Sequence, residues 1–226
     1  HDHGDEHVHG PDCDHGYETP GHDFWLDAPP ILPMQLPGNE SVADLIDNGF
    51  AHSGFNGRRL AEGAQLYQRM IDANATVALT VAGAMAPIGL GGAFISLIER
   101  GFVDFMIATG ANLYHDLHLA YGFPMVQGSA EVDDNALAED GVARIFDVFI
   151  GEEDTLMATD NKVLELLKGF DMSRPFSTAR MHHHMGRALW KQAPHPEKSF
   201  VAVAAKYDVP IYTSSPGDSS IGMNLI

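Results

Sequence analysis

Three loop-forming segments hold the residues of this sequence whose types and spacing could bind a nucleotide. They are VAGAMAPIGLGG at 81–92, TGANLYHD at 109–116 and TSSPGDSS at 213–220, and each follows a short apolar run. The first is rich in small residues, so its backbone N–H groups can approach a phosphate without side-chain hindrance. It has neither the G-x-G-x-x-G spacing nor the lysine of a P-loop, and therefore indicates a nucleotide site only together with the other two.

The polar residues of the second and third loops each allow a structural and a functional interpretation. Thr109 or Asn112 could cap the helix that the second loop opens, and His115 could be an ordinary surface histidine. Asp218 could cap the helix after the third loop, or it could bind a ribose or an amine. The three loops are stronger evidence for a ligand site together than singly, because ligands of parallel α/β sheets bind at the carboxyl ends of the strands. Their convergence predicts a nucleotide site of the doubly wound type.

The elements that must position these loops alternate between short apolar strands and amphipathic helices. Strands are predicted over 76–80, 103–108 and 209–212. Helices are predicted over 41–47, 56–71, 89–100, 112–120, 135–150, 155–170, 177–190 and 196–207. This order indicates an α/β fold, with a Rossmann-like parallel sheet and helices on both of its faces. Three strands are few for such a sheet, so we expect the sheet to be incomplete in this chain.

The chain is predicted to have three parts, a tail, a linker and a folded domain over 41–226. Residues 1–24 are rich in His, Asp and Gly and have little to bury, which predicts a flexible tail. Residues 25–40 form a proline-rich linker. The tail holds possible zinc or nickel ligands whose spacing matches no fixed metal module, namely His1, His3, His7, His9, Cys13 and His15. Consecutive side chains on a helix point in different directions, which also argues against a metal site at His182, His183 and His184. We predict no metal site.

Composition limits the partners and the location of this protein. The formal net charge of −18 argues against binding to nucleic acid or to an anionic membrane, and suits basic partners such as polyamines. Residues 73–98 contain no Asp, Glu, Lys or Arg, yet their glycines and Pro87 favour a strand, a turn and a helix over a membrane span. A single cysteine is compatible with a reducing compartment, and we predict a cytoplasmic protein.

The three loops and the segments between them resemble the deoxyhypusine synthase family. The resemblance runs through SGFNGRRLAEGAQLYQRMI, LTVAGAMAPIGLGGAFISLIERGFVD and MIATGANLYHDL, and resumes in EDGVARIFDVFI and PEKSFVAVAAKYDVPIYTSSPGDSSIGMNL. TGANLYHD and PGDSSIGMN are especially similar to the bacterial deoxyhypusine-synthase-like branch. The resemblance covers about 40–226 and corresponds to the N-terminal portion of the family.

This resemblance implies an NAD-dependent transferase. In the family, NAD takes a hydride from spermidine, and an aminobutyl group passes to an enzyme lysine and then to a lysine of a translation factor. The family forms homotetramers with active sites at a dimer interface. The implied cofactor contacts are Thr80, Gly83, Ala84, Met85, Thr109, Gly110, Ala111 and Asp218. The implied substrate contacts are Tyr114, His115 and Met223.

The sequence departs from the family at the positions that would meet the amine. Tyr114 and His115 stand where the eukaryotic enzymes have two glutamates, and Met223 stands where they have an aspartate that holds an ammonium group. The loss of these carboxylates favours an amine other than spermidine. The family's catalytic lysine lies in a Ser-Trp-Gly-Lys-type segment that is absent here. We therefore expect either a C-terminal complementing chain to supply this segment or the protein to continue beyond Ile226. The alternative is a non-catalytic subunit that assembles with and activates a full-length paralogue.

Overall fold

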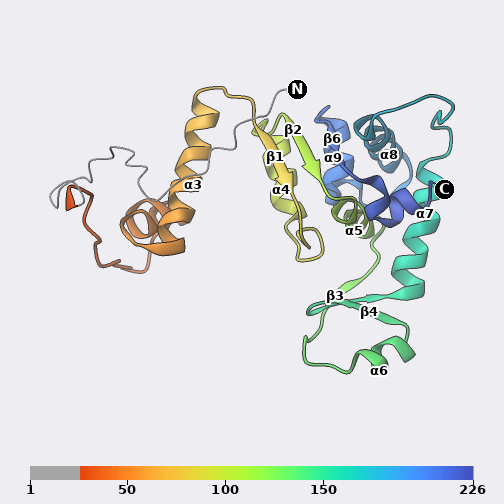
Figure 1. The fold of residues 1–226 in the computed structure, drawn as a ribbon, viewed down its shortest axis with the longest axis horizontal. Helices are drawn as coiled ribbons and strands as arrows, with labels where there is room; N and C mark the ends of the chain where they lie inside the picture. Colours follow the sequence, from red (N-terminus) through yellow and green to blue (C-terminus); the bar gives the residue numbers. More distant parts are fainter. Residues whose placement is uncertain (1–25, 226) are drawn as a thin grey trace, which may run out of the picture. The chain divides into compact units, whose positions relative to one another are not determined.

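The computed structural model describes residues 26–225 and divides into two compact units, one ending at Arg69 and the other beginning at Met70 (Figure 1). The tail predicted over 1–24, with its candidate zinc or nickel ligands, lies outside the described residues.

The first unit contains short helical turns and the first part of one long helix. Residues 27–40 have neither helix nor strand, and α2 (Val42–Asp44) then continues into η1 (Leu45–Gly49) and η2 (Phe50–His52). Ser41 and Asp44 start α2 with a capping box, in which each side chain accepts a hydrogen bond from the backbone N–H of the other. The long helix α3 (Phe55–Asp72) follows. The helices predicted over 41–47 and 56–71 are therefore confirmed.

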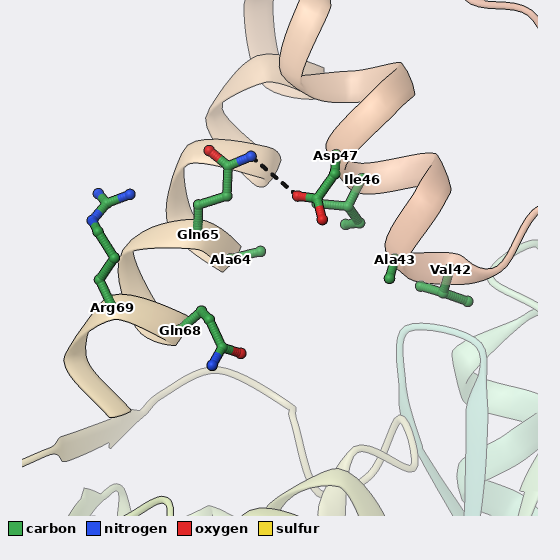
Figure 2. Close-up of a pocket in the computed structure, with 8 residues that line it drawn as sticks. All are labelled: Val42, Ala43, Ile46, Asp47, Ala64, Gln65, Gln68 and Arg69. Atoms are coloured by element: carbon green, nitrogen blue, oxygen red, sulfur yellow. Dashed lines mark hydrogen bonds between the residues drawn. The ribbon is translucent and has the colours of Figure 1, made fainter. Parts of the chain in front are cut away.

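A pocket of about 550 Å³ lies in this unit between η1 and α3 (Figure 2). Ile46 and Ala64 line the pocket with apolar side chains, and Arg69 lines it near the C-terminal end of α3. The amide of Gln65 donates a hydrogen bond of 3.1 Å to the carboxylate of Asp47, which ties the two elements together. None of the residues predicted to bind cofactor or substrate lines this pocket.

The second unit is built on a parallel sheet whose order is β1-β2-β6. The strands are β1 (Ala78–Val81), β2 (Phe105–Ala108) and β6 (Ile211–Tyr212), and all pair in parallel. Helices α4 (Gly91–Glu99), α5 (Gly110–Tyr121), α8 (Thr178–Gln192) and α9 (Phe200–Lys206) lie between them in the chain. The three strands predicted from apolar runs are confirmed, and so is the α/β class.

The two faces of this sheet differ in burial. Val81, Met106 and Ile211 point into a core formed with α4, α5, α8 and α9. Thr80, Ile107 and Tyr212 are neighbours in the register and form a row on the opposite face. Ile107 and Tyr212 remain 40% and 43% exposed, and Thr80 is exposed as well. Helices were predicted on both faces of the sheet, and in this unit they cover mainly one face.

The prediction of one helix over 135–150 is wrong. Only α6 (Asp134–Glu139) forms there, and the rest is the hairpin of β4 (Val142–Ile145) and β5 (Val148–Gly151). With β3 (Met125–Gln127), this hairpin makes a second, antiparallel sheet in the order β3-β5-β4. Among the described residues, β3, β4 and β5 are therefore strands that no apolar run predicted.

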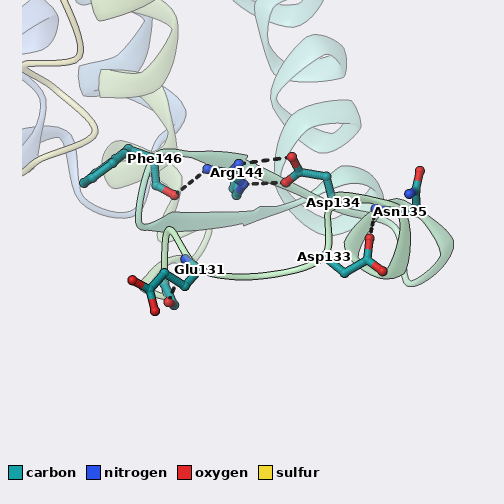
Figure 3. Close-up of polar contacts among 7 residues, drawn as sticks. Glu131, Asp133, Asp134, Asn135, Arg144 and Phe146 are labelled. Carbon is teal, nitrogen blue, oxygen red and sulfur yellow. Dashed lines mark hydrogen bonds and ion pairs between the residues drawn. The ribbon is translucent and has the colours of Figure 1, made fainter.

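The physical reason is local to the hairpin. Gly141 has a φ of +67°, which ends the helix, and Phe146 has a φ of +55° in the two-residue connection between β4 and β5. The guanidinium of Arg144 donates to the Asp134 carboxylate and, over 3.0 Å, to the carbonyl of Phe146 (Figure 3). The β-branched residues of VARIFDVFI then favour strands over a continued helix.

The remaining helices follow the predictions closely. The helix predicted over 155–170 is η3 (Glu152–Met157) followed by α7 (Ala158–Leu166). The one predicted over 196–207 is the short turn η4 (Pro196–Lys198) followed by α9. After β6, the third loop contains η5 (Pro216–Asp218) and leads into α10 (Ser220–Met223).

Candidate nucleotide and amine site

The predicted cofactor residues gather at the carboxyl-terminal edge of the parallel sheet. Thr80 lies in β1, and Gly83, Ala84 and Met85 follow in the turn after this strand. Thr109 follows β2 directly as the N-cap of α5, and Gly110 and Ala111 begin that helix. Asp218 is exposed in η5 after β6. Because the three strands are parallel neighbours, their following loops emerge at one edge.

Asn112 joins the first loop to the second. Its side-chain oxygen accepts from the N–H of Ala86 over 2.9 Å, and its amide nitrogen donates to the carbonyl of Gly83 over 2.8 Å. The same nitrogen donates to the hydroxyl of Thr109 over 2.8 Å. Asn112 is 1% exposed. The interpretation of Asn112 as a helix cap is therefore wrong, because its side chain bridges two loops across the sheet edge.

A hydrogen bond to α8 holds the third loop, and Asp218 in this loop does not cap a helix. The hydroxyl of Thr178, the first residue of α8, accepts from the N–H of Thr213 over 3.0 Å. Ser219 is the N-cap of α10, so the interpretation of Asp218 as that cap is wrong. The exposed carboxylate of Asp218 remains available to a ligand.

Asp116 is fully buried and anchors α9. Its carboxylate accepts from the backbone N–H groups of Phe200, over 3.0 Å, and Val201, over 3.1 Å, and from the hydroxyl of Ser199. Burial raises the pKa of Asp116 to about 7, although these three donors lower it. Asp116 therefore holds the start of α9 in place through these three hydrogen bonds.

Tyr114 and His115 lie on α5 in a buried polar network. The hydroxyl of Tyr114 donates to the carbonyl of Leu156 over 2.8 Å. His115 Nδ1 lies 3.0 Å from His118 Nε2, and His118 Nδ1 lies 2.7 Å from the hydroxyl of Thr159 on α7. Burial lowers the pKa of both histidines. His115 is thus a neutral, oriented imidazole at neutral pH. The interpretation of His115 as an ordinary surface histidine is therefore wrong.

Met223 belongs to the same region through α10. This helix packs on α5 and on α7, and Met223 is 60% exposed at its end. The next residue, Asn224, donates from its side-chain amide to the carboxylate of Asp160 on α7 over 3.0 Å. Asp160, His118 and Thr159 could not be predicted from the sequence, because nothing in the local sequence around them indicates their partners.

Protonation of His118 is expected to destabilise the fold in acid. Burial and the neighbouring His115 lower the pKa of His118 to about 3, from an ordinary value of 6.5. The stability contributed by the neutral ring is therefore present above pH 6.5 and is lost as the pH falls toward 3, by up to about 1.4 kcal/mol per pH unit. Urea unfolding at several pH values from about 7.5 to 5 measures this slope. His118→Gln should flatten it and the exposed His52→Gln should not; equal slopes in both variants would contradict the assignment.

Comparison with known proteins identifies the family. The family model of deoxyhypusine synthase matches residues 44–226, which is most of the chain. The chain belongs to the deoxyhypusine synthase family. The deoxyhypusine synthase-like protein of Thermosynechococcus vestitus is 43% identical over 203 residues, covering 88% of this chain and 50% of that protein. The Methanosarcina acetivorans protein named "Probable deoxyhypusine synthase 2" is 35% identical over 197 residues, covering 87% of this chain and 56% of that protein.

The fold of the family is supported by a solved structure as well. The crystal structure of an Entamoeba histolytica protein assigned as a deoxyhypusine synthase superposes with a TM-score of 0.55 at 16% identity. The match covers 86% of this chain and 65% of that chain. At this identity it shows the fold alone. This deoxyhypusine synthase family member spans about half the length of the curated relatives that it matches.

The histidines of α8 differ in burial, and His183 is exposed. His182 is buried, and its Nδ1 lies 2.8 Å from the carbonyl of Ile211 in β6. Within residues 26–225 of this deoxyhypusine synthase family member, no group of three or more His, Cys, Asp or Glu side chains is placed to hold a metal ion. The helices in the described part of the chain include none that is long and apolar enough to cross a membrane.

Proposed function

We propose that this protein takes part in the NAD-dependent transfer of an aminoalkyl group from a polyamine or a related amine. One observation carries the proposal: three loops emerge at one edge of a parallel sheet, and Asn112 fixes two of them to each other. Membership of the deoxyhypusine synthase family supports the same chemistry.

The loops fit a dinucleotide. Gly83 has a φ of +72°, and a Cβ on it would meet only the Met85 methyl, at 3.8 Å, so a ligand can approach its backbone. Thr109 makes no side-chain cap hydrogen bond to α5, which leaves the first-turn N–H groups at Gly110 and Ala111 to face an anionic group. Thr80, Ala84 and the carboxylate of Asp218 complete the proposed cofactor contacts. When bound, NAD supplies the hydride acceptor.

The amine would lie beside α5 and α10, near Tyr114, His115 and Met223. His115 is neutral because burial lowers its pKa, so its ring adds no positive charge beside a substrate ammonium. His118 engages Nδ1 of His115, which leaves Nε2 as the nitrogen that would meet the amine. The aminoalkyl group would pass first to a lysine of the enzyme. It would then pass to a lysine of a translation factor or to a second amine. A homotetramer or a C-terminal complementing chain would supply the groups that the three loops lack.

Calorimetry and absorbance spectroscopy, both with the protein as its gene encodes it, test this proposal. The expected results are NAD binding and, after addition of putrescine or spermidine, the absorbance of NADH. No NAD binding would exclude the proposed function, and NAD binding without NADH formation on any amine of a panel would exclude the transfer. The alternative of a non-catalytic subunit predicts NADH formation only after mixing with a full-length paralogue.

A further inference from the structure

Asp160 is a carboxylate at the junction of three helices of the candidate site. It lies in the first turn of α7, next to Thr159, which holds His118. Asn224, just after α10, donates to its Oδ1 over 3.0 Å, and the same amide nitrogen donates to the carbonyl of Ser220 over 2.8 Å. The hydroxyl of Tyr114 on α5 lies close enough to Asp160 for the carboxylate to raise the pKa of the phenol, after the larger effect of burial.

This carboxylate has no cation beside it in the described part of the chain. The ion pairs among residues 26–225 do not include Asp160, and the nearby Lys162 pairs with Glu165 over 2.8 Å. His115 is kept neutral by burial and supplies no positive charge. A partly buried carboxylate that is oriented by an amide but not neutralised is suited to accept a cationic group from a ligand.

The three predicted substrate positions need such a group. Tyr114, His115 and Met223 carry no negative charge at neutral pH, and Asp116 is turned into the core toward α9. A diamine or polyamine carries ammonium groups whose burial without a counter-ion is costly. Asp160 is the carboxylate that the fold brings from α7 to this side of α5 and α10.

We propose that Asp160 binds a primary ammonium group of the amine substrate. Asn224 orients the carboxylate, and the exposed Met223 beside it offers a flexible apolar surface for the methylene chain of the amine. The assignment rests on the proposed function, and it places the negative charge for the amine on α7, in place of carboxylates on α5 and α10.

Isosteric replacement tests the assignment. Asp160→Asn keeps an oxygen that can accept from Asn224 but removes the charge. The dissociation constants of NAD, and of putrescine and spermidine in the presence of NAD, are measured by calorimetry on the protein as its gene encodes it. We expect amine binding to weaken about ten- to one hundred-fold while NAD binding changes less than about two-fold, because one charge-assisted contact is lost.

Two further variants sharpen the result. Asp154→Asn makes the same change of charge at an exposed position in η3 and should leave amine affinity within about two-fold of the unaltered protein. Asp160→Glu keeps the charge and should bind amine better than Asp160→Asn, which also covers the case in which the asparagine variant folds poorly.

The outcomes separate the two proposals. Equal amine affinity in the unaltered protein and in Asp160→Asn would overturn the assignment and leave the proposed function intact. The same holds if Asp154→Asn weakens amine binding as much as Asp160→Asn, since the effect would then be one of overall charge. An unaltered protein that binds NAD but no amine overturns the proposed function and the assignment together.

Discussion

Replacement of Asp116 by alanine is expected to lower the free energy of unfolding by about 3–5 kcal/mol, the largest effect on stability that we predict. The carboxylate accepts three hydrogen bonds at the start of α9, and Phe200 to Ala205 in this helix are all buried. Alanine would leave the N–H groups of Phe200 and Val201 and the hydroxyl of Ser199 without this acceptor in a dry interior. Chemical denaturation followed by circular dichroism measures the change.

Asp133→Ala is a matched control for this effect. Asp133 also caps a helix, since its carboxylate accepts from the N–H of Asn135 over 2.9 Å, but it does so at an exposed position. Its loss should cost about 1 kcal/mol. If Asp116→Ala costs no more than Asp133→Ala, the buried hydrogen bonds of Asp116 do not stabilise α9 in the way proposed.

Asn112→Ala is expected to weaken NAD binding by ten-fold or more. The substitution removes three hydrogen bonds that hold the turn at Gly83 and Ala86 to Thr109. Without them the two loops can separate, and the cofactor would have to order them on binding. Calorimetric titration with NAD measures the affinity, and thermal unfolding should show an additional loss of about 2–3 kcal/mol because a buried donor and acceptor lose their partner.

Ser96→Ala serves as the control for Asn112. Ser96 donates to the carbonyl of Gly92 over 3.0 Å within α4, at an exposed position away from the loop bridge. This variant should bind NAD as the unaltered protein does. An Asn112→Ala protein that is folded and binds NAD with unchanged affinity would show that the bridge between the loops is unnecessary for the cofactor.

The parallel sheet could be predicted because its signals are local. Each strand is an apolar run followed by small residues, and this pattern is recognised without knowledge of any partner. The runs end at Val81, Ala108 and Tyr212. The hairpin of β4 and β5 was missed because a helical and a strand pattern compete over VARIFDVFI. The competition is decided by pairing with β3, whose residue Met125 lies opposite Ile150.

By itself, the sequence determined the family, the α/β class and the order of the loops, because motif spacing and hydrophobic pattern are properties of neighbouring residues. Only the tertiary structure decided what several side chains do. Asp116 contacts Phe200 across 84 positions, His118 contacts Thr159 across 41, and Asn224 contacts Asp160 across 64. Hydrogen bonds over such separations are set by how the helices pack, and no local pattern encodes them. For this reason the loops of the cofactor site were visible in the sequence, while the carboxylate proposed for the amine was not.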